Sequence, residues 1–242
     1  MRSTAIFLAS QILLVFISGC SIGQLKPPKP NENPAAVIFS VYILETSTKG
    51  EAKALEHVSL TGVRLVEEDK KTGEVVYARI DDDNYKIFGH NVIAVTGLTP
   101  GKKYSLAYIA FEQKQANAKV LHAYNLDYKT TLKKTPLVAK KGKVTFAGVQ
   151  GVNIRVRKKR TFTAPRQISL EVIKGEKALA QLSEAGIYGT YTTWAKQAIF
   201  GYGKKHDAKA AEKNALESVL FLQKDPYWKQ AIQNALKQCR CA

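Results

Sequence analysis

The stretch that decides the fold is "NVIAVTGLTPGKKYSLAYIAFEQ", residues 91–113. It consists of two runs rich in Val, Ile, Ala and Tyr, joined by a short segment that contains Pro100-Gly101. Branched and aromatic residues favour strands, and a Pro-Gly pair marks a turn. The stretch therefore predicts two neighbouring strands with a tight connection between them.

Similar runs, separated by turn signals such as Thr72-Gly73, extend from Ala35 to about Lys174. The clearest alternation places Val152 and Ile154 on one face of a strand, with polar residues between them. About eight such runs, with no helical pattern among them, predict an antiparallel β-sandwich or barrel.

One turn in this region carries a recognisable motif. Leu98, Pro100, Gly101 and Tyr104 have the spacing Leu-x-Pro-Gly-x-x-Tyr. This motif resembles the corner before strand F in fibronectin type III and related immunoglobulin-like domains. The resemblance implies that the Tyr104 hydroxyl bonds back to the preceding loop and pins a crossover between two sheets. It implies an immunoglobulin-like or related sandwich architecture.

After Gly175 the apolar pattern changes to a helical period. Apolar residues recur at Ala211, Ala215, Val219 and Leu222, and again at Trp228, Ile232 and Leu236. Asp225 is a candidate N-cap, and Pro226 suits a first helical position. The predicted fold class is α+β, with an antiparallel β-sandwich over residues 35–175 and a small α-helical segment over residues 176–242.

The N-terminal region predicts export. An apolar run from Ala5 to Ile17 follows a basic residue, Arg2, and ends at two small residues. A spanning helix needs about 20 apolar residues, and this run is shorter. A basic residue, a short apolar run and small residues are together typical of a secretory signal peptide. We therefore expect residues 1–19 to be a signal peptide.

The segment Ile17-Ser18-Gly19-Cys20 resembles the lipobox of bacterial lipoproteins. The resemblance implies that signal peptidase II cleaves before Cys20 and that the Cys20 thiol carries a diacylglycerol. Ser21, rather than Asp, implies the outer membrane in the enterobacterial sorting pattern. Residues 20–34 contain four prolines and few apolar side chains, which predicts an extended, lipidated tether. The alternative is an ordinary signal peptide with an incidental cysteine.

The chain is strongly basic, with 37 Lys and Arg against 20 Asp and Glu and a formal net charge of +17. Such a charge is typical of a protein with an anionic neighbour, such as lipid headgroups or envelope polymers. The densest basic cluster consists of Arg155, Arg157, Lys158, Lys159 and Arg160. We expect this basic rim to bind anionic lipid or polymer, and a solvated strand end is the alternative. Aromatic residues that would stack bases are missing from the cluster, so nucleic acid is not an expected partner.

Catalytic and metal-binding motifs are missing from the sequence. The four histidines are far apart, and neither an HExxH motif nor a GxSxG elbow occurs. Tyr85 and Lys86 occupy the positions where an EF-hand loop starting at Asp81 would need an oxygen ligand and a glycine. We expect no catalytic residue, no metal site and no cofactor. Cys239 and Cys241 could bridge each other, pair with another chain or remain free thiols.

The leading hypothesis is a non-enzymatic, lipid-anchored protein of the bacterial cell envelope, held at the membrane through Cys20. The sandwich would act as a binding or scaffolding module, and the C-terminal helices would contact an envelope protein. One alternative is a periplasmic or surface enzyme that acts on an anionic polymer, and another is a binder of anionic lipid or lipopolysaccharide. A pocket with converging carboxylates or a histidine would favour the enzyme, whereas an exposed apolar strip on the helices would favour partner binding.

Overall fold

The computed structural model describes most of the chain between residues 24 and 239. The described residues are 24–29, 34–46, 52–55, 58–68, 72–78, 80, 84–89, 91–115, 118–126, 128–134, 136–155, 169–174 and 208–239. The strands are β1 (Ala36–Thr46), β2 (Ala52–Ala54), β3 (Val58–Glu68), β4 (Val75–Tyr77), β5 (Tyr85–Phe88), β6 (Val92–Thr96), β7 (Lys103–Gln115), β8 (Ala118–Asn125), β9 (Leu137–Val138), β10 (Val144–Arg155) and β11 (Ser169–Lys174). The helices are α2 (Tyr128–Lys134), α5 (Ala208–Leu222) and α6 (Pro226–Cys239).

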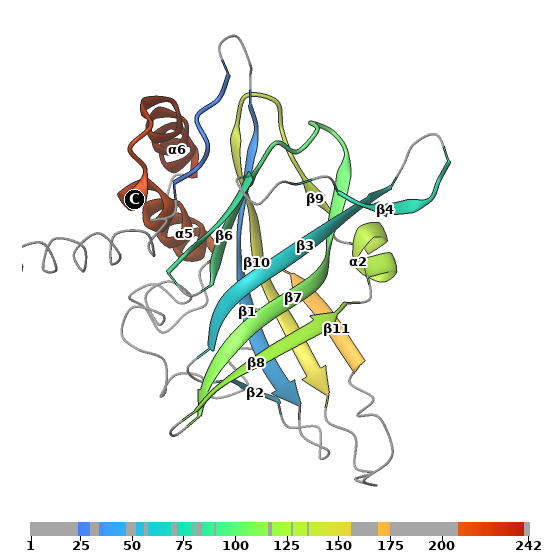
Figure 1. Ribbon diagram of the computed structural model, residues 1–242. Helices are drawn as coiled ribbons and strands as arrows, with labels where there is room; N and C mark the ends of the chain where they lie inside the picture. The colour runs from blue at the N-terminus through green and yellow to red at the C-terminus, as the bar shows by residue number, and fades with distance from the viewer. Residues whose placement is uncertain are drawn as a thin grey trace, which may run out of the picture.

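The strands form two sheets that pack face to face (Figure 1). One sheet has the order β11-β10-β1-β6-β5, with β2 beside β1, and its outer face carries α5 and α6. The other sheet has the order β4-β3-β7-β8, with β9 beside β7. We call the first the helix-covered sheet and the second the open sheet. The predicted α+β class, a β-rich region followed by helices, is confirmed.

The pairing of β1 with β10 departs from the predicted antiparallel arrangement, because these two strands are parallel. Their register runs from Ala36 opposite Val144 to Thr46 opposite Arg155. Parallel neighbours need a long connection, and here the intervening chain builds the whole open sheet before it returns. The prediction of a purely antiparallel sandwich is wrong at this pair. The partner of Ala36 lies 108 positions further along the chain, so the residues around Ala36 do not indicate the direction of this partner.

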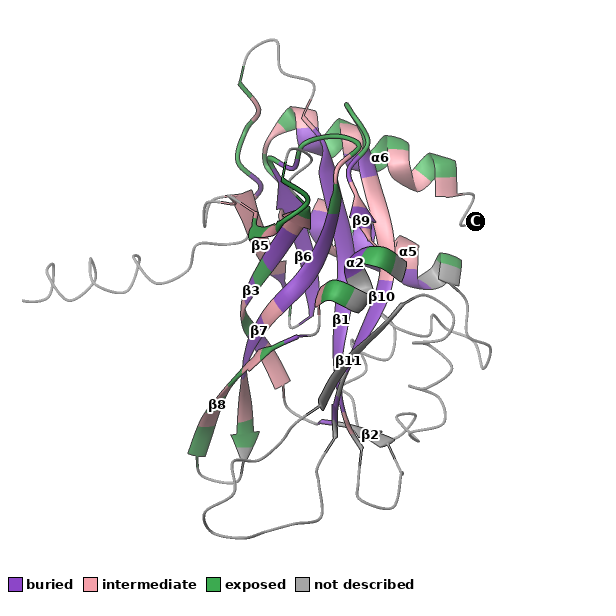
Figure 2. Cartoon of the chain, turned by 90° about the vertical axis from the view of Figure 1, so that its right-hand side faces the viewer, coloured by how far each residue is buried: buried purple, intermediate pink, exposed green. Residues whose placement is uncertain are grey.

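The central strand β1 is buried on both faces. Its odd-numbered residues from Val37 to Ile43 pack in the core between the sheets. Ala36 and Ile38 face the other way, into a second core beneath α5 and α6. Every residue from Ala35 to Leu44 is buried, as Figure 2 shows in purple along this strand. Burial on both faces explains why the strand reads as a nearly continuous apolar run.

The connection between β6 and β7 is closed by Tyr104. The backbone N–H of Thr99 donates to Tyr104 Oη at 2.9 Å. Burial of this side chain raises the pKa of the Tyr104 hydroxyl. Gly97 and Gly101 have φ angles of 73° and 78°, a left-handed conformation that glycine adopts without strain. The hydrogen bond that fixes the corner is therefore present, while the resemblance to fibronectin type III domains stays a prediction.

The two C-terminal helices form a third layer, on the helix-covered sheet. Val219 of α5 and Trp228 and Ile232 of α6 are buried in the core between the helices and the sheet. Pro226 opens α6, and the Trp228 N–H donates to Asp225 Oδ1 at 3.0 Å. Asp225 is therefore the N-cap that the sequence predicts. The apolar faces of both helices are used inside the chain.

Candidate functional site

The lipid attachment site and the basic rim predicted from the sequence lie largely outside the described residues. These residues include neither Cys20 nor Arg157, Lys158, Lys159 and Arg160. Arg155 ends β10, where its backbone is paired with Thr46 of β1 and Ser169 of β11. Lipidation at Cys20 and anionic binding by the basic rim therefore stay predictions.

Cys239, at the end of α6, is disulfide-bonded. Cys20 and Cys241 are the other cysteines of the chain, and both lie outside the described residues. The alternative of a free thiol at Cys239 is therefore wrong.

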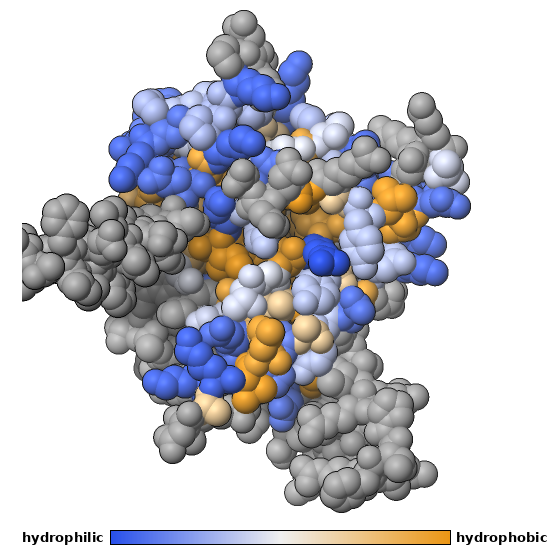
Figure 3. Space-filling model, in the orientation of Figure 1, coloured by the Kyte–Doolittle hydropathy of each residue, from blue (hydrophilic) through white to orange (hydrophobic). Residues whose placement is uncertain are grey.

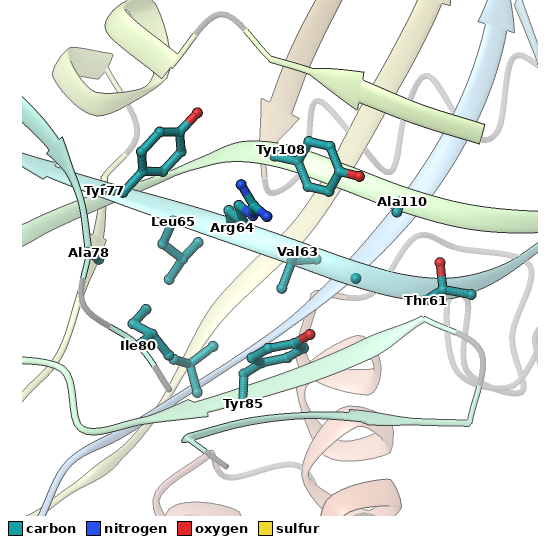
Figure 4. A pocket seen from close by; sticks show the side chains of 12 residues that line it. Thr61, Val63, Arg64, Leu65, Tyr77, Ala78, Ile80, Tyr85, Tyr108 and Ala110 are labelled. Atoms are coloured by element: carbon teal, nitrogen blue, oxygen red, sulfur yellow. The ribbon is translucent and has the colours of Figure 1, made fainter. Parts of the chain in front are cut away.

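A cavity of about 540 Å³ opens between the two sheets beside β3 (Figure 4). Its walls come from β3 and β7 of the open sheet, from β5 and β6 of the helix-covered sheet, and from the end of β4 with the residues that follow it. Gly62, Ala78 and Ala110 lie in these walls, and their small size leaves the space unfilled. Ligand sites in proteins have volumes of about 300 to 1,000 Å³, so the cavity is large enough to hold a ligand.

The cavity runs along one edge of β3. Five consecutive residues of this strand, Thr61 to Leu65, line it. Successive side chains of a strand point to opposite faces, so a space that contacts five residues in a row must lie beside the edge of the strand. Figure 4 agrees, because Val63 and Leu65 extend to one side of β3 and Arg64 extends to the other.

This edge of β3 has no strand partner beside the cavity within the described part of the chain. The opposite edge is occupied by β7, from Val58 to Glu67, and β4 pairs only with Val66 to Glu68. The N–H of Ala78 donates to the Leu65 C=O at 2.9 Å, after which the chain leaves the strand. Backbone groups of alternate residues point to the same edge. The N–H and C=O of Val63 therefore point into the cavity.

The inner wall of the cavity is apolar. Val63 and Leu65 of β3 and Val95 of β6 are buried there and belong to the core between the sheets. Tyr85 of β5 lies across the cavity from β3 (Figure 4). Figure 3 shows apolar surface, in orange, open to view between β3 and β6. An apolar group inside the cavity would pack against this wall.

The outer lip of the cavity is aromatic and basic. The Arg64 guanidinium carbon lies 5.3 Å from the centroid of the Tyr108 ring, within the range of a cation–π interaction. Tyr77 is 56% exposed, and its neighbour Val76 is also exposed. Among the residues that the structure describes, no carboxylate forms an ion pair with Arg64. The lip therefore presents a cation and two aromatic rings next to the apolar wall.

The described lining contains residue types that are common at protein interfaces. The described residues of the lining include no Asp, Glu, His, Cys or Lys. Their polar side chains are those of Tyr, Arg and Thr. Tyr and Arg are prominent among the residues that contribute most to binding at protein interfaces. Our sequence reasoning missed Arg64, Tyr77 and Tyr108. The available signal was Gly62, because a glycine inside a strand often marks the close approach of another backbone.

His122 of β8 is the one histidine among the described residues. Its ring stacks on Phe111 with a centroid distance of 4.9 Å, and its Nδ1 lies 3.2 Å from Tyr124 Oη. Its Nε2 is buried and has no hydrogen-bond partner in this part of the chain. Across the described residues, no group of three or more His, Cys, Asp or Glu side chains is placed to hold a metal ion. His122 thus packs as a single polar group against aromatic neighbours.

No family model, curated protein or solved structure matches this chain in comparisons with known proteins. Within the described ranges, no helix combines the length and the apolar character needed to cross a bilayer. The basis for a function is therefore the geometry of the cavity and the chemistry of its lip.

Proposed function

We propose that this protein is a lipid-anchored, non-enzymatic binding module of the bacterial cell envelope, and that the cavity beside β3 receives an extended segment of a partner protein. The observation that carries the binding function is the free edge of β3, set between an apolar wall and a lip of Tyr and Arg. Anchoring is supported by the lipobox-like segment that ends at Cys20. Ser21 supports the outer membrane as the location.

An extended peptide suits the cavity because it would pair with β3 next to the point where β4 stops pairing, at Val66. Its backbone would bond to the N–H and C=O of Val63, which is the way that peptides add to exposed sheet edges. Its alternate side chains would contact the Leu65 wall on one face and Tyr108 on the other. A carboxylate on the segment would pair with Arg64, in keeping with the net charge of +17.

We also propose that the sandwich is of the immunoglobulin-like kind. The hydrogen bond from the Thr99 N–H to Tyr104 Oη supports this, because a tyrosine corner makes such a bond to backbone a few residues upstream. The parallel pairing of β1 with β10 is a feature that any closer assignment of the fold must include.

The lining of the cavity is the reason to prefer a binding module to an enzyme that acts on an anionic polymer. An acid–base site commonly uses carboxylates or a histidine within reach of the substrate, and the described residues of the lining include neither. Binding of anionic lipid or lipopolysaccharide by the basic rim around Arg155 stays a separate proposal. A contact between the C-terminal helices and an envelope protein also stays a separate proposal. Such a contact would use the exposed faces of α5 and α6, because the apolar faces of these helices pack on the sheet.

Photocrosslinking in cells tests the binding site. A photoreactive phenylalanine analogue replaces Tyr77 at the lip of the cavity or, as a matched control, Leu121 of β8, which is 67% exposed and lies outside the lining. We expect a protein adduct from position 77 and none from position 121. Equal adducts from both positions, or none from position 77, would contradict the proposal.

The same assay with Arg64→Ala tests the role of the lip. Arg64 is exposed, so the melting temperature of this variant should stay unchanged. A central interface residue contributes about 2 kcal/mol or more, which corresponds to a fall of about thirtyfold in affinity. We therefore expect the adduct at position 77 to fall sharply in this variant. An unchanged adduct would remove Arg64 from the site.

A further inference from the structure

The segment ahead of β1 is tied to the helical layer. Leu25 is 1% exposed and belongs to the core beneath α5 and α6. Its N–H donates to Gln223 Oε1 at 3.1 Å, and Trp228 Nε1 donates to the Lys26 C=O at 2.8 Å. Residues 24–29, part of the predicted tether, therefore lie against the turn between α5 and α6 (Figure 1).

This contact limits how far the folded domain can stand from Cys20. Cys20 precedes Gln24, the first described residue, by four positions. An extended chain covers at most about 3.6 Å per residue, so the Cα atoms of these two residues are at most about 14 Å apart. A lipid on Cys20 would therefore hold the turn between α5 and α6 close to the bilayer surface.

The same turn presents an exposed aromatic ring and basic side chains. Phe221, in the last turn of α5, is 87% exposed, the largest exposure among the large apolar side chains that the structure describes. Lys224 and Lys229 are exposed nearby in the chain. Residues 24–29 and 221–229, at and beside this turn, together contain four lysines and one acidic residue. An apolar side chain accompanied by lysines is typical of surfaces that lie in the interface of an anionic membrane.

We propose that the turn between α5 and α6 is the membrane-contact surface of this protein, with Phe221 inserted among the headgroups of an anionic phospholipid bilayer. This proposal rests on the lipid anchor at Cys20 and adds a second contact, which sets the orientation of the folded domain. The open sheet is the layer farthest from the helices (Figure 1). The cavity beside β3 would then stay accessible to a partner in the aqueous phase.

Fluorescence of a site-specific label tests this contact in the mature, lipidated protein that begins at Cys20. Phe221→Cys and, as a matched control, Leu121→Cys are each labelled with an environment-sensitive dye, and the unsubstituted protein reports any background labelling. Both are reconstituted into vesicles of phosphatidylcholine and phosphatidylglycerol. We expect the dye at position 221 to shift its emission to shorter wavelength and to be quenched by a lipid-attached quencher. The dye at position 121 should show neither effect.

Flotation of the vesicles separates the two parts of the proposal. Protein that floats with the vesicles while the dye at position 221 emits as it does in water would overturn the contact surface and leave the anchor intact. Protein that fails to float would overturn the anchor at Cys20 and, with it, this surface. Equal shifts at positions 221 and 121 would also overturn the proposed orientation.

Discussion

The two sheets of this protein are built from similar strands, yet they differ in what their surfaces are used for. The helix-covered sheet packs one face on the open sheet and the other on α5 and α6. The apolar residues of both faces are therefore buried by other parts of the same chain. The open sheet has one face in the core and leaves an edge of β3 without a partner beside the cavity, within the described residues. The proposed binding surface thus lies where β3 lacks a neighbouring strand within the described residues.

The same contrast appears in single strands. Every residue of β1 from Ala36 to Leu44 is buried, whereas β8 alternates between exposed and half-buried residues from Lys119 to Asn125. A strand covered on both faces loses its two-residue period, and a strand covered on one face keeps it. The burial pattern of each strand therefore reports how many of its faces are covered.

The largest effect is expected on the helix-covered side. Trp228→Ala removes a side chain that is 1% exposed and its hydrogen bond to the Lys26 C=O. Loss of a buried Trp lowers the free energy of unfolding by about 3 to 5 kcal/mol, measured by urea unfolding. Phe221→Ala is the matched control, because an exposed side chain contributes within about 0.5 kcal/mol. Similar values for both variants would show that α6 does not share a core with the sheet.

A smaller effect is expected at the corner of the open sheet. Tyr104→Phe removes the acceptor of the Thr99 N–H and keeps the ring in the core. Thr99 is exposed, so its backbone N–H can donate to water in this variant. We therefore expect the free energy of unfolding to fall by only about 1 kcal/mol. Tyr108→Phe, at the lip of the cavity, serves as the control for removal of a hydroxyl. An equal loss in both variants would show that the corner has no special part in stability.

Local patterns in the sequence predict the helices and most strands well. The N-cap at Asp225, the start of α6 at Pro226 and the apolar strand β1 all depend on neighbouring residues. The parallel pairing of β1 with β10 does not depend on neighbouring residues, because the path of the chain through the other sheet fixes it. The short helix α2, Tyr128–Lys134, was also missed. We expected only strands between Ala35 and about Lys174, and the threonines of α2 gave no helical signal.

The candidate site is harder to predict than the fold. The residues expected from motif and charge, Cys20 and the basic rim, are each contiguous in the sequence. Arg64 and Tyr108 are 44 positions apart and face each other only through the register of β3 with β7. The cavity itself depends on where β4 stops pairing, at Val66. No local pattern encodes the end of a pairing between two strands, so the free edge becomes visible only in the folded chain.

Amide hydrogen exchange along β3 in the free protein tests most directly whether this edge is open. The Val63 N–H points into the cavity, whereas the Arg64 N–H faces β7. We expect the Val63 amide to exchange faster than the Arg64 amide by about tenfold or more, because its exchange needs no opening of the sheet. A Val63 amide as protected as that of Arg64 would show that the edge is already occupied and would contradict the proposed binding site.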